Sequence, residues 1–288
     1  LAGNHDYSNP TMAELWRKRF GRPYYSFVYR DVLFLCLNSE DSALHHISSA
    51  QSQWARDTLA AHSDVRWTFV FLHTPMWNYA EDYGWPGIEA SLQGRDHTVF
   101  AGHYHSYLRT ERNDTRYYIL VSTGGISRLR GPSYGEFDQV VWVTMTSSGP
   151  VIANLMLDGI LRDDIQTPES KSLVDTLSIN TFVPEILWMS DTTFPHHQVE
   201  VRSSNPTDVP VEVTFQLSSR SGLDAAFTQG FASTTDNRQT FTLQPMSSRA
   251  LDLHLSGELP TQAHQAQAAA KLTWEARLQP ADMAAMHL

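Results

Sequence analysis

Three times along this sequence, a segment with the pattern of a buried strand ends in a turn that carries histidine. The turns are Gly3-Asn4-His5-Asp6, His73-Thr74-Pro75 and Gly102-His103-Tyr104-His105. Short apolar runs such as Trp67–Leu72 and Thr98–Ala101 are typical of strands that are buried on both faces. In open α/β sheets, ligands bind at the carboxyl ends of such strands. The sequence therefore predicts an α/β fold whose sheet edge carries the three turns.

The histidines of these turns are candidate metal ligands. Neutral imidazole is the commonest nitrogen ligand for zinc and related metals. Gly102 allows a sharp backbone turn, and imidazoles two residues apart, at His103 and His105, can serve two adjacent metal ions from one loop. A single His-x-His pair also fits a solvated surface loop, so the indication comes from the three turns together.

The three turns resemble the motifs of the calcineurin-like metallophosphoesterase family, which includes the purple acid phosphatases. Gly3–Asp6 looks like the family's Gly-Asn-His-Asp/Glu motif, His73 like its isolated metal histidine, and Gly102–His105 like its Gly-His-x-His motif. The resemblance covers about residues 1–160. It implies a partial αββα-sandwich metallophosphoesterase domain and the hydrolysis of a phosphate mono- or diester.

The resemblance also implies a role for each motif residue. Asn4, His73 and His103 would bind one metal ion and His105 the other, in a dinuclear site of Fe, Mn or Zn whose metal-bound hydroxide attacks the phosphate. His5 would protonate the leaving oxygen or orient the phosphate, and Asp6 would hold the His5 imidazole. The family's Asp-x-His and Gly-Asp-x-x-Asp motifs, which supply further ligands, do not precede Gly3. We therefore expect a C-terminal part of such a domain, completed by a preceding segment or by another chain.

Four further residues are candidate substrate contacts. Trp77 and Tyr79 follow His73 in a stretch rich in Trp, Tyr, Gly and Pro, which predicts a loop over the site. Their rings could stack on a substrate or pack the loop onto its own domain. Arg128 and Arg130 could bind phosphate by bidentate contacts or lie on the surface. His45 and His46, in the polar loop after residue 37, could reach the site or be solvated, and the solvated alternative is favoured.

Composition excludes some classes of function. The formal net charge of −10 argues against non-specific nucleic-acid binding, which depends on Lys and Arg. A phosphate substrate remains compatible, because metal ions can reverse the local field. No apolar run approaches the roughly 18–20 residues that span a bilayer. The only cysteine, Cys36, lies in an apolar run and is expected to be a buried thiol, so it leaves the compartment open, with a periplasmic or secreted location favoured.

The C-terminal part of the sequence has a different pattern of polar and apolar residues. Residues 161–197 are largely polar and weakly patterned, and predict a linker. From residue 198 on, alternating segments separated by polar turns predict a small β-sandwich, residues 198–288, that resembles an immunoglobulin-like domain. The Ala/Gln-rich stretch 263–270 could be a helix or a loop inside it. No catalytic constellation is visible there.

Two alternatives to a dinuclear phosphoesterase remain open. One is a degenerate or partial phosphoesterase that acts as a binding or structural module. The other is a single-metal hydrolase of a different type that uses His73, His103 and His105.

Overall fold

The computed structural model describes residues 1–41, 43–79, 83–182, 193–219, 222–229, 232–233, 237–258, 270–278 and 286–287. They divide into two compact units, Leu1–Pro168 and Glu169–Leu288. Within these ranges, no helix is both long enough and apolar enough to cross a membrane.

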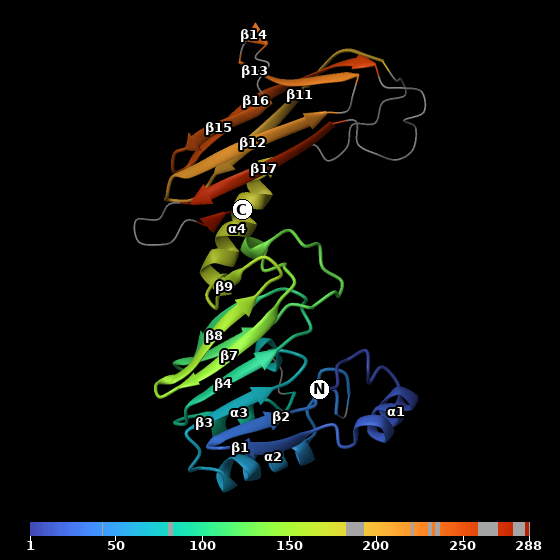
Figure 1. Ribbon diagram of the computed structural model, residues 1–288, viewed down its shortest axis with the longest axis vertical. Coiled ribbons are helices and arrows are strands. Elements are labelled where there is room, and N and C mark those ends of the chain that lie inside the picture. Colours follow the sequence, from blue (N-terminus) through green and yellow to red (C-terminus); the bar gives the residue numbers. More distant parts are fainter. Residues whose placement is uncertain are drawn as a thin grey trace. The chain divides into compact units, whose positions relative to one another are not determined.

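The first unit contains a mixed six-stranded sheet with the order β1-β2-β3-β4-β6-β5 (Figure 1). Its strands are β1 (Tyr25–Tyr29), β2 (Val32–Cys36), β3 (Trp67–Phe71), β4 (His97–Ala101), β5 (Leu108–Arg112) and β6 (Thr115–Ile119). Strands β2, β3, β4 and β6 are parallel, and the two edge strands are antiparallel to their neighbours. The predicted apolar runs thus form the centre of the sheet, and their carboxyl ends share one edge.

Different layers cover the two faces of this sheet. Helices α2 (Ser49–Ala61) and α3 (Pro86–Leu92) share a core with residues such as Leu35 and Val70. On the other face, Phe69 and Phe100 pack against Ile152 of a three-stranded sheet formed by β7 (Val140–Thr146), β8 (Gly149–Leu155) and β9 (Ile160–Arg162). Each strand can serve both layers because successive side chains point to opposite faces.

The remaining elements of the first unit lie at its loops. Helix α1 (Pro10–Phe20) begins as the sequence predicts, since the Asn9 side chain accepts a hydrogen bond from the Met12 N–H at 3.0 Å. Short 3₁₀ helices occur at η1 (Met76–Asn78) and η2 (Pro132–Tyr134). The expected loop after His73 is only partly confirmed, because it contains η1 and is followed directly by α3, while residues 80–82 lie outside the described residues.

The second unit contains two antiparallel sheets, with the orders β10-β11-β16-β13-β14 and β15-β12-β17-β18. The strands are β10 (Thr181–Phe182), β11 (Thr193–Asn205), β12 (Val211–Ser219), β13 (Leu223–Gln229), β14 (Ala232–Ser233), β15 (Arg238–Leu243), β16 (Ser247–Glu258), β17 (Ala270–Leu278) and β18 (Met286–His287). Val201, Phe215 and Phe227 belong to one core that both sheets share. The predicted alternating strands are therefore confirmed, while residues 263–269 of the Ala/Gln-rich stretch lie outside the described residues.

The predicted linker, residues 161–197, contains the boundary between the two units and also contains regular structure. Pro168–Asn180 forms helix α4, and β11 already begins at Thr193, while residues 183–192 lie outside the described residues. Val174 and Leu177 of α4 are 1% and 2% exposed, and Leu177 belongs to the core of the second unit. Tertiary packing stabilises a helix whose apolar stripe is too short to predict from periodicity.

Candidate functional site

The turns that carry histidine meet where the central strands of the first unit end. His73 lies two residues after β3, and Gly102 directly follows β4. The Gly102 N–H donates a hydrogen bond to the His73 carbonyl oxygen at 2.8 Å, which continues the pairing of the two strands into the turns. The sequence prediction that these two turns lie together is thus confirmed.

Asn4 and His73 are in direct contact. The distance between Asn4 Oδ1 and His73 Nε2 is 2.9 Å. Gly3 makes this contact possible, because a Cβ atom at that position would lie 2.9 Å from His73 Nδ1. Burial lowers the pKa of His73 from its usual 6.5, and the nearby His103 lowers it further. The imidazole is therefore neutral at pH 7, the form that binds metal ions.

His103 lies between two other imidazole rings. Its ring centroid is 5.3 Å from that of His73 and 4.9 Å from that of His45, and both pairs are edge-to-face. Burial lowers the pKa of His103, and His45 adds to the effect. His45, His103 and His105 have φ angles of 57°, 72° and 54°, in the left-handed region that side chains with a Cβ rarely adopt.

The expectation that His45 is a solvated loop residue is wrong. Its Nδ1 lies 3.2 Å from Thr74 Oγ1 and 3.4 Å from a carboxylate oxygen of Glu40. Glu40 is only 5% exposed, and it also accepts hydrogen bonds from Thr74 Oγ1 at 2.8 Å, Ser39 Oγ at 3.1 Å and the His45 N–H at 2.8 Å. Glu40 is therefore a residue beside the histidines that sequence reasoning missed, and His45 follows the less favoured of the two alternatives. The available signal was their position shortly after β2, the neighbour of β3.

His46 differs from its neighbour. Its ring contacts Tyr83 edge-to-face, with centroids 6.2 Å apart. It lines a separate open hollow of about 300 Å³, together with residues of α2 such as Ser52 and Arg56. Adjacent histidines of one loop thus face different surroundings.

The other motif residues lie around this cluster. His5 is exposed, and the Asp6 carboxylate accepts a hydrogen bond from the Gly3 N–H at 2.9 Å, which closes the turn that contains Asn4. His105 donates from Nδ1 to the Ile126 carbonyl oxygen at 2.6 Å, because a carbonyl can only accept. This bond leaves a lone pair on His105 Nε2 when the ring is neutral.

The two aromatic candidate residues, Trp77 and Tyr79, lie in different surroundings. Trp77 is 7% exposed and packs against Trp85 and Tyr117, so it stabilises the core and does not line the site. The Tyr79 ring lies 5.5 Å from the His45 ring. Burial, together with the nearby Tyr104, raises the pKa of Tyr79 to about 12, so its hydroxyl stays protonated. Of these two candidates, only Tyr79 is adjacent to the histidines.

The two arginines occupy an exposed loop. Arg130 makes two hydrogen bonds with the Glu136 carboxylate, at 2.6 and 2.9 Å, and its guanidinium lies over the Tyr134 ring. This pairing lowers the pKa of Glu136. Arg128 is exposed. The surface alternative therefore describes Arg130 better than phosphate binding does.

Whether these residues fit a metal ion depends on donor type and spacing. Nitrogen from imidazole together with an amide oxygen is a donor set that zinc and similar ions accept. In the described part of the chain, however, no group of three or more His, Cys, Asp or Glu side chains is arranged to hold a metal ion. The cluster thus provides suitable donors in contacting pairs, without a closed set of ligands.

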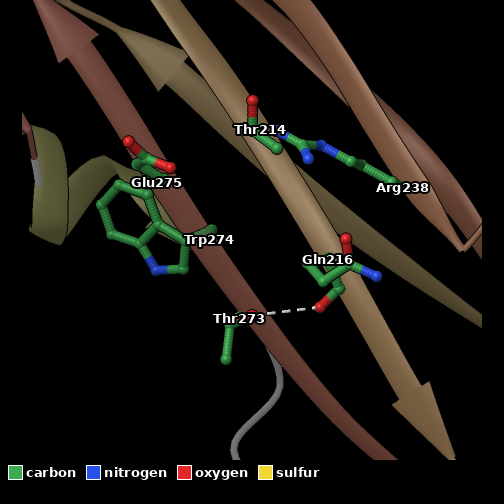
Figure 2. A pocket seen from close by; sticks show the side chains of 6 residues that line it. All are labelled: Thr214, Gln216, Arg238, Thr273, Trp274 and Glu275. Atoms are coloured by element: carbon green, nitrogen blue, oxygen red, sulfur yellow. Dashed lines mark hydrogen bonds between the residues drawn. The ribbon is translucent and has the colours of Figure 1, made fainter.

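A hollow of about 240 Å³ lies on the four-stranded sheet of the second unit. Figure 2 shows Thr214 and Gln216 of β12 between Arg238 of β15 and Glu275 of β17, with a hydrogen bond from Thr273 Oγ1 to the Gln216 carbonyl oxygen at 3.2 Å. The lining contains no histidine or cysteine. This hollow is a polar sheet surface, unlike the histidine cluster.

No protein-family model matches the sequence, and no curated protein matches it.

Proposed function

We propose that the first unit takes part in metal-dependent hydrolysis of phosphate esters, as the resemblance to calcineurin-like metallophosphoesterases implies. The observation that carries the proposal is the contact of Asn4, His73 and His103, which are far apart in sequence and which the family motifs assign to one metal ion. An imidazole nitrogen and an amide oxygen that bind one ion must lie next to each other. Asn4 Oδ1 and His73 Nε2 are adjacent in this way, at the hydrogen-bond distance of 2.9 Å.

The spacing of the rings also supports the proposal. A metal–nitrogen bond of about 2.0–2.1 Å places the ion about 3.2 Å from the centre of an imidazole ring. Two rings bound to one ion at angles of about 90–110° then have centroids about 4.5–5.2 Å apart. The centroids of His73 and His103 are 5.3 Å apart, slightly above that range.

In the proposed reaction, each residue of the site would have its own role. Asn4, His73 and His103 hold one ion, and His105, whose Nε2 carries a lone pair, holds the other. Bound ions of this kind activate water and neutralise charge on phosphoryl oxygens. His5 is exposed and can reach a substrate, where it donates a proton to the leaving oxygen. Asp6 acts through the backbone, because its bond to Gly3 shapes the turn that presents Asn4 and His5.

In this proposal the first unit is the larger part of an αββα sandwich, and the second unit is an immunoglobulin-like appendage. The helix–sheet–sheet layering of the first unit supports the αββα sandwich. The two sheets around one core of the second unit support the immunoglobulin-like domain.

The alternative of a binding module has one specific observation in its favour. Val140, Trp142 and Val151 on β7 and β8 are 60%, 60% and 58% exposed, so this sheet presents apolar side chains to solvent. Large exposed apolar patches mark interaction sites.

Metal content and phosphatase activity test the proposal. We expect purified chain to retain or take up Zn²⁺, Mn²⁺ or Fe, and to hydrolyse p-nitrophenyl phosphate or bis(p-nitrophenyl) phosphate. His103→Ala and Asn4→Ala should each reduce metal content and activity strongly. His62→Ala, at the end of α2, is the matched control and should change neither. Activity that survives Asn4→Ala would favour a single-metal hydrolase, and a chain that binds no metal would contradict the proposal.

A further inference from the structure

We propose that the open edge of β1 pairs with the same edge of a second copy of this chain, in an antiparallel arrangement centred on Phe27. Strand β1 (Tyr25–Tyr29) is the last strand of the six-stranded sheet, and among the described residues no strand pairs with its outer side (Figure 1). The inference does not depend on the proposed function, because none of the residues assigned to the metal site lies in β1.

The two edges of this sheet differ in charge. Strand β5, at the opposite edge, carries Arg109, Glu111 and Arg112. Strand β1 has the sequence Tyr-Ser-Phe-Val-Tyr, without charge or proline, and its register with β2 is continuous, without a bulge. Charges, proline and bulges are the features by which proteins keep exposed edges from pairing with other chains. The β5 edge is therefore protected against such pairing, whereas the β1 edge is open to it.

An exposed aromatic surface adjoins the open edge. Tyr25, Phe27 and Tyr29 share one face of β1 and are 45%, 47% and 62% exposed. The Phe27 ring stacks on the ring of Phe34 in β2, with centroids 4.7 Å apart. Further into the sheet the same face is covered, since Phe69, the neighbour of Phe34 on β3, is 3% exposed and belongs to the core shared with β8. The aromatic layer that forms a core at the centre of the sheet thus reaches solvent at β1.

Strand β1 is complementary to itself under a two-fold axis. In an antiparallel pair centred on Phe27, this residue faces Phe27 of the partner subunit, and Tyr25 faces Tyr29 of the partner subunit. Aromatic side chains that lie opposite each other on two strands stabilise the pairing. A two-fold interface brings the same surface of both copies together, so all three aromatic positions of β1 meet an aromatic residue at once.

The backbone supports the same register. A two-residue turn, residues 30–31, joins β1 to β2, so Tyr29, which precedes the turn, is hydrogen-bonded to β2. Hydrogen-bonded pairs alternate along an antiparallel ladder, so Phe27 also directs its N–H and C=O to β2, whereas those of Ser26 and Val28 point to the open side. In the register centred on Phe27, Ser26 lies opposite Val28 of the partner subunit. The outward backbone groups of the two copies therefore pair with each other.

Sedimentation equilibrium of the full chain over a concentration series tests the inference. We expect the wild type to form a dimer. Phe27→Lys places two like charges opposite each other at the axis, so it should weaken the dimer at least about 100-fold. Val28→Pro removes one N–H from the open side, which an edge strand tolerates. It should also weaken the dimer, while circular dichroism shows that the chain keeps its fold.

A cysteine variant at the two-fold axis tests the register. Residues that lie opposite each other without being hydrogen-bonded have Cα atoms about 4.5 Å apart, a distance that a disulfide can span. Under mild oxidation Phe27→Cys should therefore form a disulfide-linked dimer. Tyr29→Cys should not, because position 29 faces Tyr25 of the partner subunit, and a linked dimer of Tyr29→Cys alone would contradict the register. The native Cys36 is buried and should not compete.

Val140→Lys is the matched control, because Val140 is a 60% exposed apolar residue on β7, an edge strand of the other sheet of this unit. It should leave the dimer unchanged. A monomeric wild type would overturn the inference, and so would a dimer that Val140→Lys dissociates and Phe27→Lys does not. Metal content and phosphatase activity are measured separately, so failure of this inference leaves the proposed function standing.

Discussion

The two units use polar residues in opposite ways. In the second unit, β12 alternates strictly, with Val213 and Phe215 buried and Thr214 and Gln216 facing the solvent side of the sheet. In the first unit, polar side chains gather past the strand ends, where Glu40 and Thr74 are 5% and 0% exposed. Alternation is explained by packing alone, whereas a buried carboxylate beside the imidazole of His45 is not. This difference is the reason why the proposed function is assigned to the first unit.

The largest expected effect tests whether the second unit is explained by packing alone. Phe215→Ala removes a fully buried ring from its core and should lower the free energy of unfolding by about 3–5 kcal/mol. Urea unfolding followed by circular dichroism measures this loss. Thr214→Ala, on the other face of the same strand, should change it by less than about 0.5 kcal/mol. A fall in Zn²⁺ affinity in Phe215→Ala would contradict the separation of packing from function.

A smaller effect is expected from the buried carboxylate of the first unit. Glu40→Ala leaves Thr74, Ser39 and the His45 N–H without their acceptor, and should destabilise the protein by about 1–3 kcal/mol. The matched carboxylate of the second unit is Glu200, whose exposed side chain pairs with Arg202. Glu200→Ala should change stability by less than about 1 kcal/mol in the same urea experiment. If Glu40→Ala and Glu200→Ala changed stability equally, the two units would not differ in how they use their carboxylates.

Lowering the pH should lower the free energy of unfolding of the first unit, because its buried histidines become protonated. Burial lowers the pKa values of His73, His97 and His103 below their usual 6.5. Between these values and 6.5 the unfolded chain binds more protons, so stability is present above pH 6.5 and is lost as the pH falls through the folded pKa values. Urea midpoints of metal-free protein between pH 7.5 and 5 measure this. A His73→Asn/His103→Asn double variant should show a flatter profile, and an unchanged slope would assign the effect elsewhere.

The smallest effect is expected at the exposed arginine loop. Arg130→Ala removes an ion pair with Glu136 whose arginine side chain is 43% exposed, so it should lower the free energy of unfolding by less than about 1 kcal/mol. Because Arg130 is engaged by Glu136, kcat/KM for a phosphate ester should be unchanged. A large rise in KM in a steady-state assay would instead indicate that Arg130 contacts the substrate.

Much of the first unit follows from local pattern. The runs at Val32–Cys36, Trp67–Phe71 and His97–Ala101 are buried on both faces, so their composition alone identifies them as central strands. The turns after β3 and β4 then meet because parallel strands end at the same edge. Helix α3 was not predictable in this way, because it directly follows the Trp-, Tyr- and Gly-rich stretch.

The site was predictable only where a motif marks it. Asn4, His73 and His103 stand out because of their neighbours in sequence. Glu40 carries no such mark, and the sequence alone favoured a solvated His45, because the positions of both residues depend on burial and on hydrogen bonds to Thr74, about 30 residues away. Trp77 shows the opposite error, because its position after His73 suggested a substrate contact and the fold buries it.

The backbone of the three histidines has a consequence for protein engineering. His45, His103 and His105 all have positive φ angles, a conformation that destabilises a residue with a Cβ by about 1–3 kcal/mol. Glycine at the same positions would relieve that strain. A screen that selects only for heat resistance should therefore enrich glycine at these positions and discard the histidines. Under the proposed function, thermostable variants of this chain would have to be selected for metal uptake at the same time.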